Sequence, residues 1–324
     1  IYAHALVFDR LTNTVTLASR SSQSAHLGAI KSYQMLDQQA DQSTSGKSGL
    51  AGPWQHQMSR TQYGEKFKCV QAYLRQGDCY QINLTQRFSA PHLGDEYQTY
   101  LFLAAKNNMP FSAFVRLPDS AILSVSPERF IQCHQGKIQT KPIKGTRPRS
   151  AIVKEDQALA AELLASEKDR SENLMIVDLL RNDIGRSAIA GSVKVPKLFE
   201  IESFTNVHHL VSTIEAQLPD DISPVSLLKN AFPGGSITGA PKIRAMNIID
   251  ELEPHRRSIY CGSIGYISAD GQMDTNITIR TLLCLDNTLY CWAGGGIVAD
   301  SQEDEEYQEC FDKVASIMPL LSNQ

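Results

Sequence analysis

The feature that most constrains the fold of this 324-residue chain is a series of short strand-like runs joined by short turns. The runs are rich in β-branched, aromatic and other apolar residues, and turn-forming residues bound them, which is typical of β-strands. They span residues 80–88, 112–117, 121–125, 129–133, 260–267, 273–285 and 288–292. Strands joined by short turns pair antiparallel, because a parallel pair needs a long crossover. We therefore expect 260–292 to form an antiparallel meander.

Helical patterns separate these runs. Ser59 to Gln62 carries a capping-box signature, and apolar residues follow at helical spacing up to Gly77. The same reasoning predicts helices at 96–106, 242–253 and 301–318, the last ended by Pro319, and two helices within 155–182 broken near Ser166. It also predicts a hairpin within 1–18, a helix near 29–38 and long strands over 199–217.

The composition excludes several classes of function. Lys+Arg number 31 against 35 Asp+Glu, a net charge of −4, so the basic excess typical of nucleic-acid binding is missing. No apolar run is long enough to span a bilayer. The seven cysteines are scattered and form no C-x-x-C pair, which fits a reduced cytoplasmic protein and argues against a structural zinc site. We expect no nucleic-acid or membrane partner.

Lys144 is the first candidate catalytic residue. It lies in the stretch Pro142-Ile143-Lys144-Gly145-Thr146, where the glycine lets the backbone turn sharply. A lysine at the end of a strand is a nucleophile if burial or nearby positive charge lowers its pKa. Lys141, Arg147 and Arg149 are close enough in sequence to supply that charge. The alternative interpretation is a solvated basic loop.

Glu128 is the second candidate. It follows Pro127 between two expected strands, where a proline marks a strand edge or a bulge. A glutamate directed from a bulge into a cleft can act as a general acid or base. The alternative is a surface salt bridge with Arg129.

Two acid pairs form a candidate metal site. Asp169 and Glu172 stand three residues apart at the start of one apolar helix face, and Glu306 and Glu309 do so on another helix. Either pair alone is explained by favourable charge at a helix N-terminus, and Glu309 could also pair with Lys313. Together, on separate helices, they indicate a shared Mg²⁺ site.

Four further features point to anion binding or close backbone approach. Arg280, within an expected apolar strand, needs a partner, for which a substrate carboxylate is suited. The glycine-rich loop 233–242 leads into a helix and could present backbone N–H groups to an anion, without the spacing of a Walker motif. Gly294-Gly295-Gly296 would allow a second close approach. His208 and His209 must face opposite ways in a strand, and a core histidine is the alternative to a catalytic one.

Together, these stretches resemble the chorismate-utilising enzymes from about Ser59 to the C-terminus. The matching motifs are Ser-Pro-Glu-Arg-Phe at 126–130, Pro-Ile-Lys-Gly-Thr at 142–146, Glu-Asn-Leu-Met-Ile-Val-Asp-Leu from 172, Arg-Asn-Asp from 181, Gly-Ala-Pro-Lys from 239 and Gly-Gly-Gly-Ile-Val-Ala-Asp-Ser from 294. Lys144 favours the subfamily that aminates chorismate at ring carbon 4, because anthranilate synthases usually carry alanine at that position.

The resemblance implies an α+β fold of two large, mostly antiparallel β-sheets packed as a sandwich with helices outside, as in anthranilate synthase component I. It implies that chorismate and ammonia give 4-amino-4-deoxychorismate, a precursor of p-aminobenzoate and folate. Lys144 would attack ring carbon 2 while Glu128 protonates the departing 4-hydroxyl. The alternatives are an anthranilate synthase component I, an isochorismate synthase, or an inactive fragment that only binds.

Matching positions imply roles for the other candidates. Glu172 and Glu309 would be inner Mg²⁺ ligands, with Asp169 and Glu306 acting through water. Asp169 stands where some relatives have glutamate, so its reach toward the metal is shorter. The implied substrate contacts are His209, Ser236, Tyr260, Arg280, Gly294, Gly295 and Gly296.

The resemblance also implies the organisation and the partner. One chorismate-binding catalytic domain would span 1–324, with 1–58 as a partial N-terminal region that includes a mobile linker near 41–52, and 59–324 as the catalytic core. Ammonia would come from a glutamine amidotransferase subunit in a heterodimer. Family members carry a further segment ahead of Ile1, with outer strands and an effector pocket, and we expect this chain to lack it.

Overall fold

The structure, a computed structural model, describes residues 2–9, 11–19, 28, 30–31, 48–204 and 207–322. The chain divides into two compact units, Ile1–Lys47 and Ser48–Gln324. In the first, β1 (His4–Asp9) and β2 (Thr14–Ser19) pair antiparallel, which confirms the predicted hairpin. The helix predicted near 29–38 and the linker predicted near 41–52 fall largely outside the described residues.

The unit Ser48–Gln324 contains an eight-stranded antiparallel sheet in the order β13-β5-β17-β16-β7-β6, with β3 and β4 also paired to β5. Its strands are β3 (Gly49–Leu50), β4 (Gln55–His56), β5 (Gln81–Leu93), β6 (Phe111–Arg116), β7 (Ser120–Ser126), β13 (Gly239–Ala240), β16 (Thr281–Leu285) and β17 (Thr288–Ile297). β17 pairs with β5 along its whole length, so these two strands form the longest ladder of the sheet.

A second, seven-stranded antiparallel sheet runs in the order β10-β12-β9-β8-β15-β14, with β11 also paired to β12. Its strands are β8 (Arg129–His134), β9 (Lys137–Thr140), β10 (Ile143–Pro148), β11 (Lys194–Ser203), β12 (Val207–Gln217), β14 (Gly265–Ile267) and β15 (Met273–Asn276). Phe130 and Ile131 of this sheet share one buried apolar cluster with Leu283 and Trp292 of the first sheet. The predicted α+β fold with two large antiparallel sheets is therefore confirmed.

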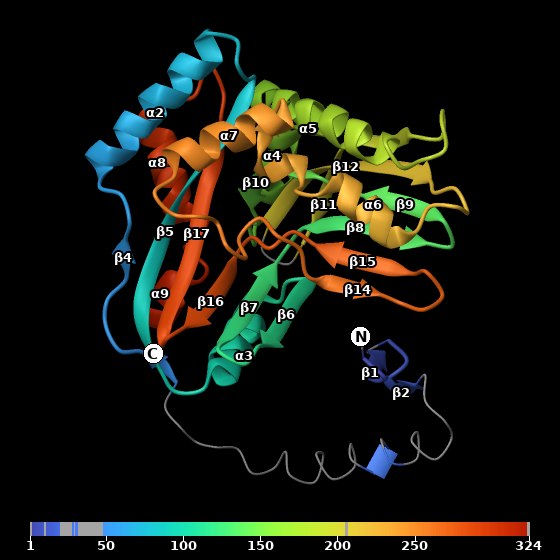
Figure 1. Cartoon of the computed structure of the whole chain (residues 1–324). Helices are drawn as coiled ribbons and strands as arrows, with labels where there is room; N and C mark the ends of the chain where they lie inside the picture. Colours follow the sequence, from blue (N-terminus) through green and yellow to red (C-terminus); the bar gives the residue numbers. More distant parts are fainter. Residues whose placement is uncertain are drawn as a thin grey trace. The chain divides into compact units, whose positions relative to one another are not determined.

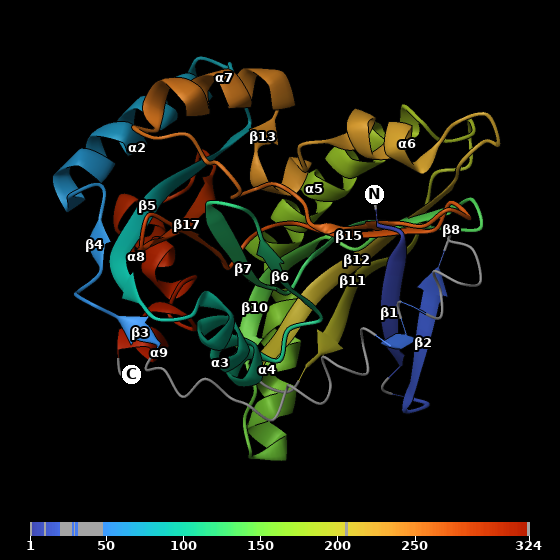
Figure 2. The ribbon, with the colours of Figure 1, turned by 60° about the horizontal axis from the view of Figure 1, so that its bottom comes forward.

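The helices lie outside the sheets. Figures 1 and 2 show α2 and α7 on the β5 and β17 side of the unit, and α4 and α5 beside β10 and β12. The helices are α2 (Arg60–Arg75), α3 (Glu96–Asn107), α4 (Val153–Ala165), α5 (Glu167–Gly185), α6 (Pro224–Ala231), α7 (Lys242–Leu252), α8 (Glu303–Asp312) and α9 (Met318–Ser322), with a 3₁₀ turn, η1, at Gly235–Ile237. Among the described residues, no helix is long and apolar enough to cross a membrane.

Two helix boundaries follow from local capping, as predicted. Ser59 Oγ accepts the N–H of Gln62, and Gln62 Oε1 accepts the N–H of Ser59, which completes the capping box of α2. Ser166 ends α4 and caps α5 by accepting the N–H of Asp169 at 3.3 Å. This cap places Asp169 in the first turn of α5, where the helix begins beside β10.

The predicted meander over 260–292 is wrong. The span 273–285 is two strands in different sheets, since β15 pairs with β8 and β14, whereas β16 pairs with β7 and β17. The chain crosses between the sheets at 277–280, where Arg280 has a left-handed φ of 49° that ends the ladder. Tyr260 lies in a turn and not in a strand, because only Gly265–Ile267 pairs as β14.

The predicted helix over 301–318 is also too long. α8 ends at Asp312, turns follow to Ile317, and Pro319 lies in the first turn of α9, a position that tolerates proline, instead of ending the helix. α6 was not predicted from the sequence, although Ser223 caps it and Pro224 begins it, a recognisable start signal.

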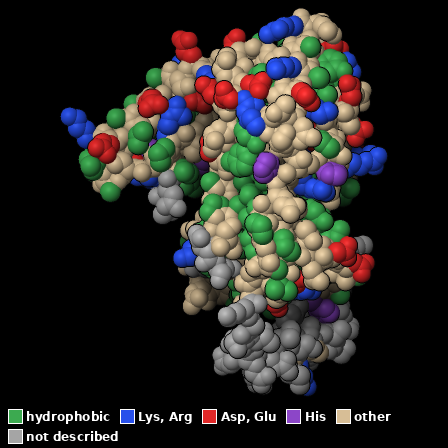
Figure 3. Space-filling view, turned by 90° about the vertical axis from the view of Figure 1, so that its left-hand side faces the viewer, with side chains coloured by type: hydrophobic (Ala, Val, Ile, Leu, Met, Phe, Trp, Pro, Cys, Tyr) green, Lys and Arg blue, Asp and Glu red, His purple; other side chains and the backbone are tan. Residues whose placement is uncertain are grey.

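Surface charge agrees with the balanced composition. Figure 3 shows one face of the molecule, on which acidic and basic side chains are interspersed over the upper part.

Candidate active site

Lys144 stands at a break in strand β10. The pairing of β10 with β12 shifts register between Lys144 and Thr146, and Gly145 at the break has φ +76°. A Cβ at Gly145 would come within 2.8 Å of Asp169 Cγ and Leu163 Cδ1, so only glycine lets α4 and α5 approach this closely. The predicted sharp turn after Lys144 is therefore present, and it brings the acidic start of α5 beside the lysine strand.

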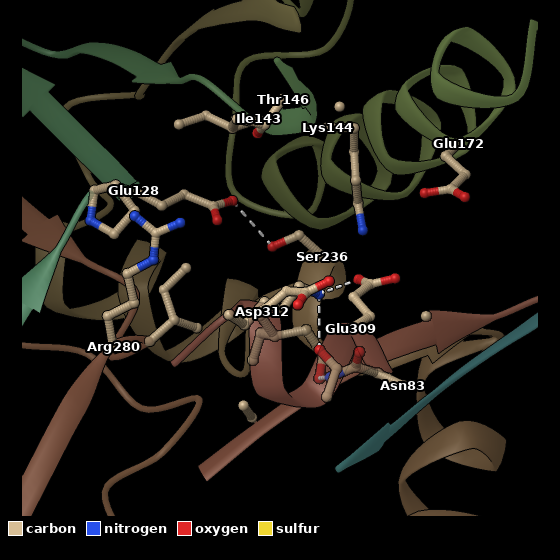
Figure 4. A pocket seen from close by; sticks show the side chains of 18 of the residues that line it. Asn83, Glu128, Ile143, Lys144, Thr146, Glu172, Ser236, Arg280, Glu309 and Asp312 are labelled. Carbon is tan, nitrogen blue, oxygen red and sulfur yellow. Dashed lines mark hydrogen bonds and ion pairs between the residues drawn. The ribbon is translucent and has the colours of Figure 1, made fainter. Parts of the chain in front are cut away.

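The candidate residues border one cavity of about 530 Å³. Figure 4 shows Lys144, Glu128, Ser236, Arg280, Glu172 and Glu309 around it. Twelve of the thirteen predicted site residues line it: Glu128, Lys144, Asp169, Glu172, His209, Ser236, Tyr260, Arg280, Gly294, Gly296, Glu306 and Glu309. Gly295 does not line the cavity, but a Cβ there would lie 2.7 Å from Glu306 Oε2 and 3.0 Å from Glu309 Oε1. Gly295 thus makes room for the two glutamates.

Glu128 is a buried carboxyl near the lysine. Its side chain is buried, and Ser236 Oγ donates to its Oε1 at 3.3 Å. Burial raises the pKa of Glu128 from 4.5 to about 7, although the positive charges of Lys144 and Arg280 act to lower it. The alternative of a salt bridge with Arg129 is wrong, because Arg129 pairs with Asp274 at 3.0 Å. A carboxyl that holds its proton near neutral pH is suited to general-acid chemistry.

Three carboxylates act on the charge of Lys144. Glu128, Glu172 and Glu309 all interact electrostatically with its ammonium. The three cations expected to supply positive charge are each paired with an acid: Lys141 with Glu202, Arg147 with Glu162 and Arg149 with Asp156. They are therefore largely neutralised, and the expectation that they activate Lys144 is not supported by their contacts.

The two acid pairs meet at the cavity from different helices. Glu172 comes from α5 and Glu306 and Glu309 from α8. Burial raises the pKa of Glu172 and raises that of Glu306 to about 7. Burial would also raise the pKa of Glu309, but Lys313 Nζ at 2.5 Å holds it below its usual range. The ion pair between Glu309 and Lys313, which the sequence offered as an alternative role for Glu309, is therefore present.

The acidic wall has features that suit a hard cation. Glu306 Oε1 accepts a hydrogen bond from Ser301 Oγ at 2.6 Å, whereas its buried Oε2 has no hydrogen-bond partner. Carboxylate oxygens are the ligands that Mg²⁺ prefers, and Mg²⁺ keeps several waters beside one or two of them. Within the described part of the chain, no three acidic, histidine or cysteine side chains converge as a complete ligand cluster. The unpartnered Oε2 of Glu306 is the observation that suits this wall to a cation.

Arg280 and the histidines occupy distinct positions. Arg280 lines the cavity and forms no ion pair with an acidic side chain of the described residues, so its need for an anionic partner remains. Burial, with Arg280 nearby, lowers the pKa of His209 to about 4, and His209 Nδ1 lies 2.9 Å from Thr146 Oγ1. His208 instead faces Asp156 at 3.0 Å, so the adjacent histidines face opposite ways, as predicted.

The glycine-rich loop contributes the Ser236 side chain to the cavity, and two of its N–H groups are already hydrogen-bonded within the loop. The N–H groups of Ile237 and Thr238 bond within the loop, to Gly234 O and Gly235 O. Ser236, which precedes Ile237, donates to Glu128. The start of α7 at Lys242 lines a second hollow and not this cavity. The predicted anion contact at the helix start therefore does not belong to the candidate active site.

Sequence reasoning missed several lining residues. Lys168 precedes Asp169, and Asn83 and Trp292 come from β5 and β17. The ring of Trp292 stacks on Tyr260 with centroids 6.4 Å apart. Lys168 could have been found from its position beside Asp169, whereas no local signal indicates Asn83 or Trp292.

Comparisons with known proteins agree on one family. A family model described as "chorismate binding enzyme" matches residues 1–319. The chain is 58% identical to "Aminodeoxychorismate synthase component 1" of Escherichia coli (strain K12), over 99% of this chain and 69% of that protein. It is 57% identical to the protein of the same name of Salmonella typhimurium (strain LT2), over 100% of this chain and 70% of that protein. Among solved structures, anthranilate synthase component I from Streptococcus pneumoniae TIGR4 matches with a TM-score of 0.86 at 34% identity, covering 98% of this chain and 72% of that chain.

Proposed function

The chain belongs to the chorismate-binding enzymes, and we propose that it converts chorismate and ammonia into 4-amino-4-deoxychorismate and water. The observation that carries this proposal is the presence of Lys144 and the buried Glu128 in one cavity with the unpaired Arg280. The names of the relatives at 58% and 57% identity support the same reaction, whereas the anthranilate synthase structure is more distant at 34%.

The cavity offers separate places for the two carboxylates of chorismate. Arg280 is suited to the enolpyruvyl carboxylate, because guanidinium pairs with a carboxylate through two parallel hydrogen bonds. Glu172 and Glu309 would hold Mg²⁺ directly, and Asp169 and Glu306 through water. When bound, the metal would supply positive charge for the ring carboxylate. His209, Tyr260, Gly294 and Gly296 then line the space for the ring.

The reaction uses Lys144 as nucleophile and Glu128 as acid and base. Lys144 first loses its ammonium proton to solvent, and the neutral amine attacks ring carbon 2, the two ring double bonds shift, and the bond from carbon 4 to the hydroxyl oxygen breaks. Glu128 protonates that oxygen, so water leaves in place of hydroxide, which is a poor leaving group. Ammonia then adds at carbon 4, the double bonds return, and the bond from carbon 2 to Lys144 breaks. The surplus proton of the new ammonium returns to the Glu128 carboxylate.

Ammonia is proposed to come from a separate glutamine amidotransferase subunit in a heterodimer. Glutamine hydrolysis needs an activated thiolate. Burial raises the thiol pKa of Cys261 and Cys284 to about 11, and that of Cys291 and Cys310 to about 12. These thiols are poor nucleophiles, and the relatives' name "component 1" agrees with a partner subunit. We place the protein in the cytoplasm, on the path to p-aminobenzoate and folate.

Product identification tests this proposal. The purified chain is incubated with chorismate, Mg²⁺ and an ammonium salt at high pH, and the products are identified by mass. We expect 4-amino-4-deoxychorismate. Anthranilate or isochorismate would contradict the proposed reaction, and chorismate binding without turnover would identify a fragment that only binds.

A further inference from the structure

Ser301 is a buried serine in the turn between β17 and α8, and its hydroxyl proton has one direction. The residue is 8% exposed, and its Oγ accepts the N–H of Val298 at 3.1 Å. The same hydroxyl donates to Glu306 Oε1 at 2.6 Å, the length of a charge-assisted hydrogen bond. A backbone N–H can only donate and an ionised carboxylate can only accept, so the single proton of the serine points at the glutamate.

The turn that carries Ser301 is fixed from two sides. The N–H of Ser301 donates to Val298 O at 3.1 Å, so the serine closes the turn with its backbone as well as with its hydroxyl. From α2, Gln71 Nε2 donates to the same carbonyl at 2.9 Å, and Gln71 is about as buried as the serine. Glu306 Oε1 is therefore bonded to a hydroxyl whose position is set by the backbone.

Helix capping does not explain this hydroxyl. The N-cap of α8 is Gln302, which makes no side-chain cap hydrogen bond. A capping side chain accepts an N–H of the first helical turn. Ser301 Oγ instead accepts the N–H of Val298, directly after β17, and donates to a side chain of the helix. The serine therefore acts on the carboxylate of Glu306 and not on the helix start.

Glu306 differs from neighbouring acids of α8 because it has no basic partner. Glu303 and Asp304 both pair with Arg60 of α2. Within the described part of the chain, Glu306 forms no such ion pair, although it is only 4% exposed. A buried carboxylate without a compensating charge is costly. A bound cation would supply that charge.

The second oxygen of Glu306 is placed to serve such a cation. Oε2 is buried, and no described residue forms a hydrogen bond with it. A Cβ on Gly295 would lie 2.7 Å from this oxygen and 3.0 Å from Glu309 Oε1, so both oxygens lie close to one point beside the glycine strand. Because Ser301 holds Oε1, the free oxygen of Glu306 is the one on the side of Glu309.

We propose that Ser301 is a positioning residue of the Mg²⁺ site: by holding Oε1 of Glu306, its hydroxyl directs Oε2 toward the metal or a metal-bound water. This inference rests on the proposed function, in which Glu306 serves the metal. Ser301 touches neither the metal nor chorismate, and it exchanges no proton. Groups that orient metal ligands in this way typically contribute about 10- to 100-fold to metal affinity.

Calorimetric titration of the purified chain with Mg²⁺ alone tests the proposal. We expect Ser301→Ala to raise the Kd for Mg²⁺ about 10- to 100-fold. The matched control is Gln71→Met, which removes the other side-chain hydrogen bond to the same turn and leaves the bond from Ser301 to Glu306 in place. Its Kd should change by less than about twofold, because the ligand orientation is kept.

A double-mutant cycle shows whether Ser301 acts through Glu306. In a Glu306→Ala background, Ser301→Ala should change the Kd by less than about a further twofold, because no carboxylate remains to be oriented. If Ser301→Ala does not fold, as judged by circular dichroism, Ser301→Cys takes its place. Cysteine is similar in size and only a weak donor, so the same loss of Mg²⁺ affinity is expected.

Three results would overturn the inference: parent-like Mg²⁺ affinity in the Ser301 variant, an equal loss in Gln71→Met, or a loss that persists in the Glu306→Ala background. The last two would assign the effect to the turn and not to the carboxylate. Absence of Mg²⁺ binding by the parent chain would overturn it as well. Failure of the proposed function looks different, since the parent chain would then bind Mg²⁺ with these same variant effects yet form no 4-amino-4-deoxychorismate.

Discussion

Glu128→Gln should make the protein more stable and less active. Burial raises the pKa of Glu128 from 4.5 to about 7, so the folded protein disfavours the charged carboxylate. Between these two values the unfolded chain releases the proton while the folded chain retains it, and stability falls as pH rises. At about 1.4 kcal/mol for each pH unit, the full cost above pH 7 is about 3 kcal/mol. Glutamine has nearly the same shape and no charge, so it avoids this cost.

Urea unfolding followed by tryptophan fluorescence measures the effect, since Trp54 and Trp292 both belong to the unit Ser48–Gln324. At pH 8 we expect Glu128→Gln to raise the free energy of unfolding by up to about 3 kcal/mol, and at pH 4.5 by close to zero. Glu65→Gln, on the exposed side of α2, is the control and should change it by less than about 0.5 kcal/mol at either pH. Turnover by Glu128→Gln should fall about 10²–10⁴-fold. A variant less stable than the parent at pH 8, or a difference independent of pH, would refute this reasoning.

Three further predictions follow from the site. Ser236→Ala removes the hydroxyl that lowers the pKa of Glu128, so the basic limb of the pH–rate profile should move to higher pH. An unchanged basic limb would show that Ser236 does not affect the protonation of the catalytic acid. Glu172→Gln and Glu309→Gln should each weaken Mg²⁺ binding at least about tenfold by calorimetry while leaving the fold intact, and unchanged binding in both would show that the metal site is elsewhere. The purified chain should release no glutamate from glutamine, because burial raises the pKa of the Cys261 thiol; detectable release would contradict the need for a partner.

Local signals predicted the helix starts and most strands well. The capping box at Ser59 and the cap at Ser166 depend on residues within one turn, so the sequence contains the whole interaction. The crossing at Arg280 could not be found in this way. Both halves of 273–285 bury residues and keep a strand-like pattern, yet they pair with different partners, β8 and β7, which only the tertiary fold determines.

The candidate site likewise contains residues that local sequence patterns predict and residues that they do not. Lys144, Glu128 and the acid pairs stand in unusual local contexts, and the fold brings them to one cavity. No local sequence pattern indicates Asn83, because its partner Ile237 is 154 positions away in the chain. The pairing of Lys141 with Glu202, 61 positions away, was equally hidden, and it changes the charge that reaches Lys144. Long-range pairing of polar groups is the part of the site that a single sequence does not reveal.

The central claim is that Lys144 forms a covalent bond to chorismate during amination. The most direct test is the rate of 4-amino-4-deoxychorismate formation by Lys144→Ala, with saturating ammonia, chorismate and Mg²⁺. We expect amination to be lost while chorismate still binds, because alanine offers no nucleophile at the end of the β10 half-strand. Amination at the unmodified rate would contradict it and would leave direct attack of ammonia on chorismate as the mechanism.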